Sequence, residues 1–149
     1  MNGMKDQTLA LAALPDIAPA YEALYASLWS QGHIPSAVLE LCRLRLAQLH
    51  NSAADIECEY VELPATKRSS LARWNTEPLY SEAEKSCIAF TEVYAMDAQS
   101  ITDEHAAAVK VYYGDSGLVL LIEALGILDG RIRLGLLWQS MNSATGEGT

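Results

Sequence analysis

The segment from Pro35 to Leu49 constrains the fold most, because it carries more apolar residues than a surface helix needs. Pro35 and Ser36 are typical of a helix start. Apolar residues then recur at helical spacing and widen into a broad face: Leu39, Leu41, Cys42, Leu44, Leu46 and Leu49. The segment therefore predicts a helix whose apolar stripe is wider than that of a surface helix.

Helical spacing continues on both sides of this segment. Ser81 and Glu84 have the spacing of a capping box at the start of a further helix. No alternating strand pattern of useful length occurs, so the sequence predicts an all-α fold of about six helices. The expected helices are 18–31, 35–49, 52–63 (ended by Pro64), 81–96, 102–114 and 116–140, with a helical turn plus loop over 66–78 and a frayed tail over 141–149.

Length and charge limit the class of protein. A chain of 149 residues is the size of one domain, which we expect to span 1–149 with its core over 35–138. The net charge of -9 disfavours nucleic acid and anionic membranes as partners. A local group of arginines could still bind a small anionic molecule. We therefore expect no nucleic-acid and no membrane partner.

Two further observations favour a cytoplasmic location. No secretory signal is recognisable, and the apolar stretch from Leu118 to Leu137 is interrupted by charged residues, so we do not expect it to span a membrane. The three cysteines are odd in number and lack metal-ligand spacing: Cys42, Cys58 and Cys87. They are expected to be buried thiols in a reducing compartment.

The segment from Glu40 to Glu59 carries a motif. It consists of E-L-x-R-L-R-x-A-Q-L, a short polar break, and then Ser52-x-x-Asp55-x-x-x-Glu59. With the helix order that follows it, this segment resembles the carboxymuconolactone decarboxylase and alkylhydroperoxidase D superfamily over about Pro35 to Trp138. The resemblance implies an alkylhydroperoxidase D-like helical bundle that assembles into trimers or hexamers.

The motif departs from the redox members of that superfamily. In those members, the resemblance implies, the positions that match Ser52 and Asp55 are cysteines and the position that matches Glu59 is a histidine. The acid of the proton relay matches Glu40, and this residue alone is retained. A serine and an aspartate cannot form or resolve a disulfide, so peroxide reduction through these positions is excluded. The branch without cysteines is the closer match, because Ser52 and Asp55 fit it. Glu59 departs from that branch too. The branch has a histidine at this position, and that histidine is its natural proton donor.

Each motif residue also has a structural interpretation. Ser52 and Asp55 suit the N-cap and first turn of a helix. Glu59, with Glu57 and Glu62, suits a solvated face. For Glu40 we favour a buried polar role in the site, paired with Arg43 or Arg45. If Glu40, Asp55 and Glu59 cluster, their mutual repulsion could instead raise the pKa of a glutamate, which could then donate a proton.

Other candidate groups have weaker patterns. Cys58 lies one turn after Asp55, but its acidic neighbours disfavour a thiolate, and a core cysteine is expected. The carboxylates and nearby His50 match no established ligand set, so we expect no metal and no cofactor. Arg131 and Arg133 could bind a carboxylate substrate, pair with Glu123 or Asp129, or lie in a subunit interface. Packing roles are expected for the three tryptophans: Trp29, Trp74 and Trp138.

The sequence leaves three functional hypotheses. The first is cofactor-free acid–base chemistry, a decarboxylation or lactone-type reaction, on a small anionic molecule. The second is a non-catalytic binding or assembly protein with a degenerate site, and the third is antioxidant activity through Cys58. Apolar excess along Leu118 to Trp138 adds to the expectation of a homo-oligomer. The candidate catalytic residues are Glu40, Ser52, Asp55 and Glu59.

Overall fold

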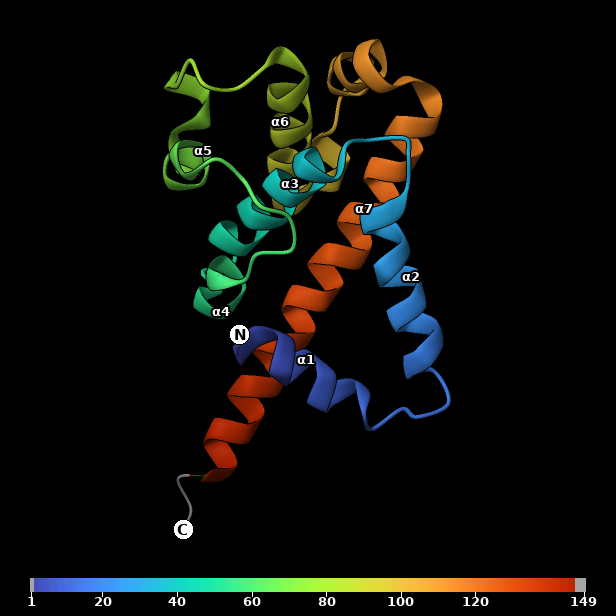
Figure 1. Cartoon of the computed structure of the whole chain (residues 1–149), viewed down its shortest axis with the longest axis vertical. Helices are drawn as coiled ribbons and strands as arrows, with labels where there is room; N and C mark the ends of the chain where they lie inside the picture. The colour runs from blue at the N-terminus through green and yellow to red at the C-terminus, as the bar shows by residue number, and fades with distance from the viewer. Residues whose placement is uncertain (1, 147–149) are drawn as a thin grey trace.

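The computed structural model describes residues 2–146 and folds most of them into helices. No strand occurs in this range, so the all-α prediction is confirmed. Figure 1 shows α7 running the length of the molecule, with α2 along one side and α3 and α6 on the other. In chain order the elements are α1 (Asn2–Leu11), α2 (Ala18–Ser30), α3 (Ser36–Leu49), α4 (Ala53–Glu57), α5 (Ala65–Ser70), η1 (Leu71–Thr76), α6 (Glu82–Met96), η2 (Ala98–Ser100) and α7 (Asp103–Gly146).

Helix α3 lies at the centre of the core, as its broad apolar face predicts. Leu39 and Leu46 on one side pack with the buried residues of α7. Leu41 and Leu44 on the other side belong to a second cluster with Leu71, Tyr80 and Ile88. The predicted capping box also forms: Ser81 accepts from the backbone of Glu84, whose carboxylate accepts from the backbone of Ser81. Local signals therefore place these two helices correctly.

Helix α7 contains a sharp break at Gly114. Its φ of 68° and ψ of -173° lie in a region that only glycine adopts readily. The break separates 103–113 from the long apolar part that follows, which matches the two helices expected from the sequence. A Cβ at this position would meet nothing within 4 Å, so lack of space does not explain the glycine. It is needed for its backbone conformation.

We expect Gly114→Ala to lower the free energy of unfolding by about 1–3 kcal/mol, because alanine is strained in this conformation. Gly130→Ala is the matched control, since Gly130 lies in helical backbone of α7 and has equally open space. That change should raise the stability by about 0.5–1 kcal/mol, because alanine suits a helix interior better than glycine. Denaturant unfolding measures both. Equal effects of the two substitutions would contradict this role of Gly114.

The prediction of a helix over 52–63 is wrong beyond Glu57. In a continued helix, the backbone N–H groups of Tyr60 and Val61 would donate to carbonyls one turn earlier. Both donate instead to the carboxylate of Glu40, at 2.6 and 3.0 Å. The carbonyls released at the end of α4 accept from the guanidinium groups of Arg43 and Arg68. Charged groups on other elements, buried at Glu40 and Arg43 and half-buried at Arg68, therefore end α4 after one turn.

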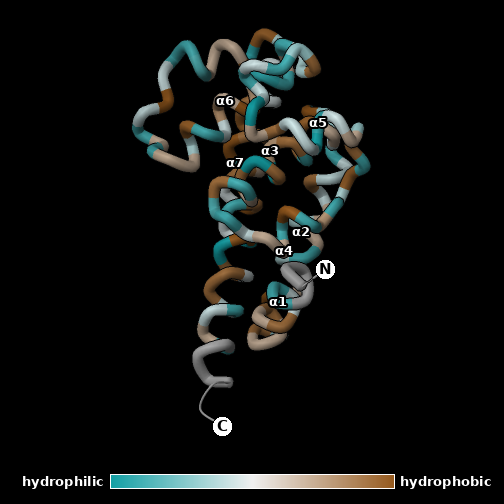
Figure 2. The backbone as a smooth tube through the Cα atoms, turned by 90° about the vertical axis from the view of Figure 1, so that its left-hand side faces the viewer, coloured by the Kyte–Doolittle hydropathy of each residue, from teal (hydrophilic) through white to brown (hydrophobic). Residues whose placement is uncertain are grey.

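The two ends of the chain also differ from the prediction. Residues 2–11 form α1, a helix that the sequence analysis did not anticipate. Side and front views both show α1 beside the lower part of α7 (Figures 1 and 2), against which it packs. At the other end, α7 extends to Gly146, beyond the end predicted at 140, and 141–145 contain no proline or glycine. The rest of the predicted tail, 147–149, lies outside the described residues.

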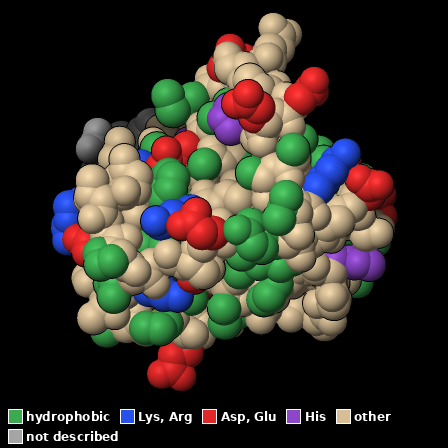
Figure 3. Space-filling model, turned by 90° about the horizontal axis from the view of Figure 1, so that it is seen from above, with side chains coloured by type: hydrophobic (Ala, Val, Ile, Leu, Met, Phe, Trp, Pro, Cys, Tyr) green, Lys and Arg blue, Asp and Glu red, His purple; other side chains and the backbone are tan. Residues whose placement is uncertain are grey.

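Helix α7 exposes many apolar side chains. By length and composition alone, Asp103–Asn142 could cross a membrane, and 28% of its most apolar stretch is buried inside the molecule. The core helix of a helical bundle meets the same test, so the expectation that Leu118 to Leu137 does not span a membrane stays a prediction. On the face seen from above, charged side chains of both signs lie among hydrophobic ones (Figure 3).

Candidate functional site

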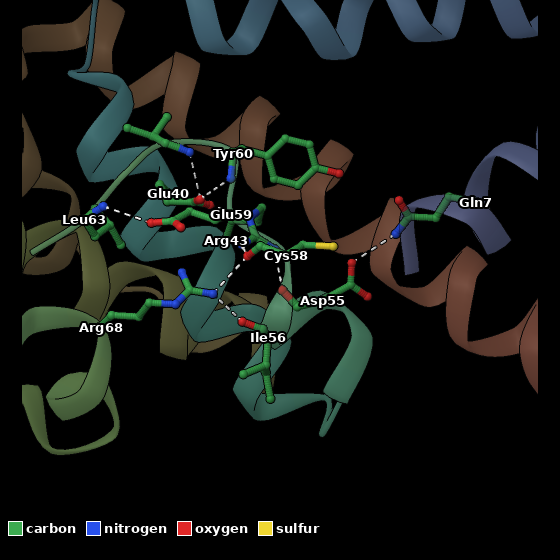
Figure 4. Close-up of polar contacts among 11 residues, drawn as sticks. Gln7, Glu40, Arg43, Asp55, Ile56, Cys58, Glu59, Tyr60, Leu63 and Arg68 are labelled. Atoms are coloured by element: carbon green, nitrogen blue, oxygen red, sulfur yellow. Dashed lines mark hydrogen bonds and ion pairs between the residues drawn. The ribbon is translucent and has the colours of Figure 1, made fainter. Parts of the chain in front are cut away.

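Glu40 and Arg43 form a buried ion pair on α3. Glu40 is 0% and Arg43 1% exposed, and the Nε of Arg43 donates to Oε1 of Glu40. The other carboxylate oxygen of Glu40 accepts from the backbone of Tyr60 and Val61, as Figure 4 shows. The two remaining guanidinium nitrogens of Arg43 donate to the carbonyl oxygens of Asp55 and Cys58, at 2.8 and 2.7 Å. The pair therefore fastens the segment that follows α4 onto α3.

Ser52 and Asp55 occupy the N-terminus of α4. The Ser52 hydroxyl accepts from the backbone N–H of Asp55 at 3.4 Å and lies 2.6 Å from Oδ2 of the same residue, to which it donates. Both residues are buried, at 2% and 3% exposure. The structural interpretation of these positions, an N-cap with a carboxylate in the first turn, thus describes their local geometry.

Glu59 lies apart from this buried arrangement. Its side chain is exposed, and its carboxylate accepts a long hydrogen bond of 3.4 Å from the backbone of Leu63. Glu57 and Glu62 are exposed as well, which fits the solvated face considered from the sequence. Of the three motif carboxylates, the structure buries Glu40 and Asp55 and leaves Glu59 in solvent.

The second oxygen of Asp55 leads to a polar chain that includes α1 and α7. Its Oδ1 accepts from the side-chain amide of Gln7 at 3.1 Å. The amide oxygen of Gln7 accepts from Nε of Arg131 at 2.9 Å, and another nitrogen of Arg131 donates to Glu22 at 3.1 Å. Gln7 is 1% and Arg131 4% exposed. The amide of Gln7 therefore joins two buried groups of opposite charge.

Aromatic rings surround the two buried arginines. The guanidinium carbon of Arg131 lies 4.1 Å from the ring centroid of Tyr25, and that of Arg43 lies 4.9 Å from the ring of Tyr60. Tyr60 also stacks on Trp29 with a centroid distance of 5.3 Å. Burial raises the pKa of Tyr25, and the neighbouring Tyr60 raises it further, so its phenol keeps its proton at neutral pH.

Comparisons with known proteins bear on the fold. No family model and no curated protein matches the chain. A solved Agrobacterium tumefaciens protein of unknown function, provisionally assigned to AhpD-type antioxidant defence, is 18% identical with a TM-score of 0.75, over 87% of this chain and 92% of that one. The chain has the alkylhydroperoxidase D-like fold.

A second solved structure shares the AhpD-like fold. It is a cysteine-to-alanine variant of the debrominase Bmp8 in complex with 2,3,4-tribromopyrrole. It is 18% identical to this chain and has a TM-score of 0.72, over 87% of this chain and 72% of its own length. At this level of identity the likeness concerns the fold alone.

The cysteines of this AhpD-like chain lie in the interior. All three are buried, and no disulfide occurs within residues 2–146. Burial raises the pKa of the Cys42 thiol and raises that of Cys87 to about 11, so both stay protonated at neutral pH. Cys58 follows the last residue of α4, and its carbonyl accepts from Arg43 and Arg68. Figure 4 shows its sulfur within the same group of residues.

Arg131 and Arg133 of α7 have different partners. Arg133 pairs with Asp129 at 2.7 Å, one of the partners considered from the sequence. Asp129 also contacts His50 at 2.6 Å, which joins the end of α3 to α7. Arg131 pairs instead with Glu22 of α2, a residue that the sequence analysis had not singled out. Among the described residues, no group of three or more histidine, cysteine or acidic side chains is arranged to hold a metal.

The surface cavities of the described part of the chain include four of about 220 to 500 Å³. None of these four is lined by Glu40, Ser52, Asp55 or Glu59. The one nearest to the polar chain, about 410 Å³, lies between α7 and residues Leu11 and Tyr21. The side chains of Asp55 and Gln7 are both buried, and Gln7 of α1 is the residue that completes the site. Sequence reasoning missed Gln7 because its only signal was one polar residue beside an apolar run.

Proposed function

We propose that this chain is a non-catalytic small-molecule-binding protein of the AhpD-like fold, with its ligand site between Asp55 and Arg131. One observation carries the proposal: the buried side chains of Asp55 and Arg131, of opposite charge, are joined through the amide of Gln7. A carboxylate and a guanidinium set apart in this way suit the recognition of a polar ligand, since each offers strong, directed hydrogen bonds. This is the binding function considered from the sequence, now attached to particular residues.

The contacts of the other motif residues support binding over turnover. Both oxygens of Glu40 already accept from Arg43 or from backbone N–H groups, which suits an anchor better than a proton relay. Glu59 is exposed and does not take part in the buried site. Serine and aspartate at the positions of the two cysteines leave no dithiol. The motif residues therefore suit ligand binding better than acid–base or thiol chemistry.

The proposal is tested by a thermal-shift screen that includes the lactones and acids of aromatic degradation. Ligands are expected to stabilise the wild type, to lose their effect in Asp55→Asn, and to keep it in the exposed control Glu59→Gln. No product should form during incubation. Ligands that bind Asp55→Asn as well as the wild type would contradict the placement of the site.

The second candidate is acid–base turnover of a small anionic molecule, a decarboxylation or lactone-type reaction. The burial of Asp55 beside Ser52, with Arg131 joined to it through Gln7, favours this candidate, since such a pair could hold an anionic substrate near a base. Product formation that Asp55→Asn abolishes and Glu59→Gln leaves intact would establish it in place of simple binding.

We expect no thiol-dependent peroxide reduction. The wild type, Cys42→Ser and Cys58→Ser should all show only the background rate with a dithiol and hydrogen peroxide, because the motif offers no pair of sulfurs. Measuring dithiol consumption checks this. Turnover that survives Cys42→Ser and disappears in Cys58→Ser would overturn the prediction and assign a redox role to Cys58.

A further inference from the structure

We propose that the site between Asp55 and Arg131 takes small molecules that carry a primary carboxamide, and that α1 closes it by inserting the carboxamide of Gln7. This inference rests on the proposed function, since it names the ligand class and the gate of the same site. Figure 4 shows the side chain of Gln7 reaching Asp55 from a separate helix. The chain thus holds an amide of its own where an external ligand would bind.

The hydrogen-bond pattern selects an amide. Arg131 donates to the oxygen of the Gln7 amide at 2.9 Å, and Asp55 accepts from its nitrogen at 3.1 Å. A carboxylate in the same place would set a negative oxygen against Asp55, and a ketone or a tertiary amide would offer it no N–H. Because both protein groups are buried, a ligand that leaves either one unpaired loses much of its affinity.

The shape of the site admits a group of this size. Gly135 of α7 faces the Gln7 side chain, and a Cβ there would lie 3.2 Å from Cγ and 3.3 Å from the amide nitrogen. The absence of a side chain at this position therefore makes room for the amide. On the other side, the ring of Tyr25 lies against Arg131 and fixes the direction of its guanidinium.

Helix α1 packs against α7 and α4 and carries Gln7 into the site, so it is the element that acts as the gate. Among residues 6–11, only Gln7, Ala10 and Leu11 are buried, and Leu9 is 51% exposed. The connection over 12–17 is exposed throughout. Elements with few buried apolar contacts open at a lower free energy than the core does. When α1 leaves, Asp55 and Arg131 become accessible, and an external amide competes with Gln7.

The first test uses the full chain with Gln7→Ala and acetamide, which has the atoms that this substitution removes. Fragments of this size bind at about millimolar concentration. At about 100 times the dissociation constant, acetamide should raise the folding equilibrium constant of Gln7→Ala about 100-fold. N,N-dimethylacetamide and acetate should not. Leu11→Ala is the matched control: it loosens α1 without leaving an amide-shaped gap, so acetamide should not restore it.

The second test compares hydrogen exchange of the wild type with that of Gln7→Ala. Acetamide should accelerate exchange of the α1 backbone amides in the wild type, because it displaces Gln7, and should slow it in Gln7→Ala, because it binds beneath a docked helix. If acetamide and dimethylacetamide act alike, or α1 exchange does not respond to acetamide, the inference is overturned. In that case a ligand without an amide that binds the wild type and not Asp55→Asn would still support the proposed function.

Discussion

The substitution Arg43→Met is expected to lower the free energy of unfolding by about 3–5 kcal/mol. Arg43 is 1% exposed and neutralises Glu40, which is 0% exposed, so its removal leaves a buried carboxylate without its counter-charge. It also leaves the carbonyl oxygen of Asp55 without the donor it has now. Methionine fills a similar volume, so the loss reports charge and hydrogen bonding more than an empty cavity. Denaturant unfolding measures it.

A second substitution separates the charge from the packing. Adding Glu40→Gln to Arg43→Met removes the uncompensated charge and keeps an oxygen acceptor for the backbone of Tyr60 and Val61. The double variant should therefore be more stable than Arg43→Met alone. Arg45→Met is the matched control, because Arg45 is on the same helix and pairs with Glu92 while both are partly exposed. Its cost should be about 0–1 kcal/mol, and an equal cost at both arginines would show that burial of the pair is unimportant.

The helices that the sequence predicted well depend on short-range patterns. The broad apolar face of α3 and the capping box of α6 are complete within a few residues of chain. The break at Gly114 is likewise encoded by the one residue type that tolerates its backbone angles. Sequence periodicity reports this local information directly.

The candidate site depends on contacts between distant parts of the chain. Glu40 was expected to pair with Arg43 or Arg45, and only the structure distinguishes them, because Arg45 turns to Glu92 on α6. The early end of α4 follows from a carboxylate 20 residues before Tyr60. Gln7 lies 48 residues from Asp55 and 124 from Arg131. No periodic pattern records separations of this kind, so the polar chain could not be predicted from one sequence.

Leu125→Ala is expected to lower the free energy of unfolding by about 2–5 kcal/mol. Leu125 is 0% exposed on α7 and packs in the main core cluster with residues of α2, α3 and α6. Removing its side chain loses apolar burial and leaves a cavity that close-packed neighbours fill only in part. Because α7 passes through the centre of the fold, the cost should appear in every probe of global unfolding.

Leu137→Ala is the control, and it also tests self-association. Leu137 is on the same helix but 61% exposed, so in a monomer its loss should change stability by less than about 0.5 kcal/mol. If copies of the chain associate through the exposed apolar side of α7, as its excess of apolar residues indicates, the cost at Leu137 should grow with protein concentration while that at Leu125 should not. A small effect at Leu137 across all concentrations would place any subunit contact elsewhere on the surface. The two leucines thus distinguish the side of α7 that the fold buries from the side that only a partner could bury.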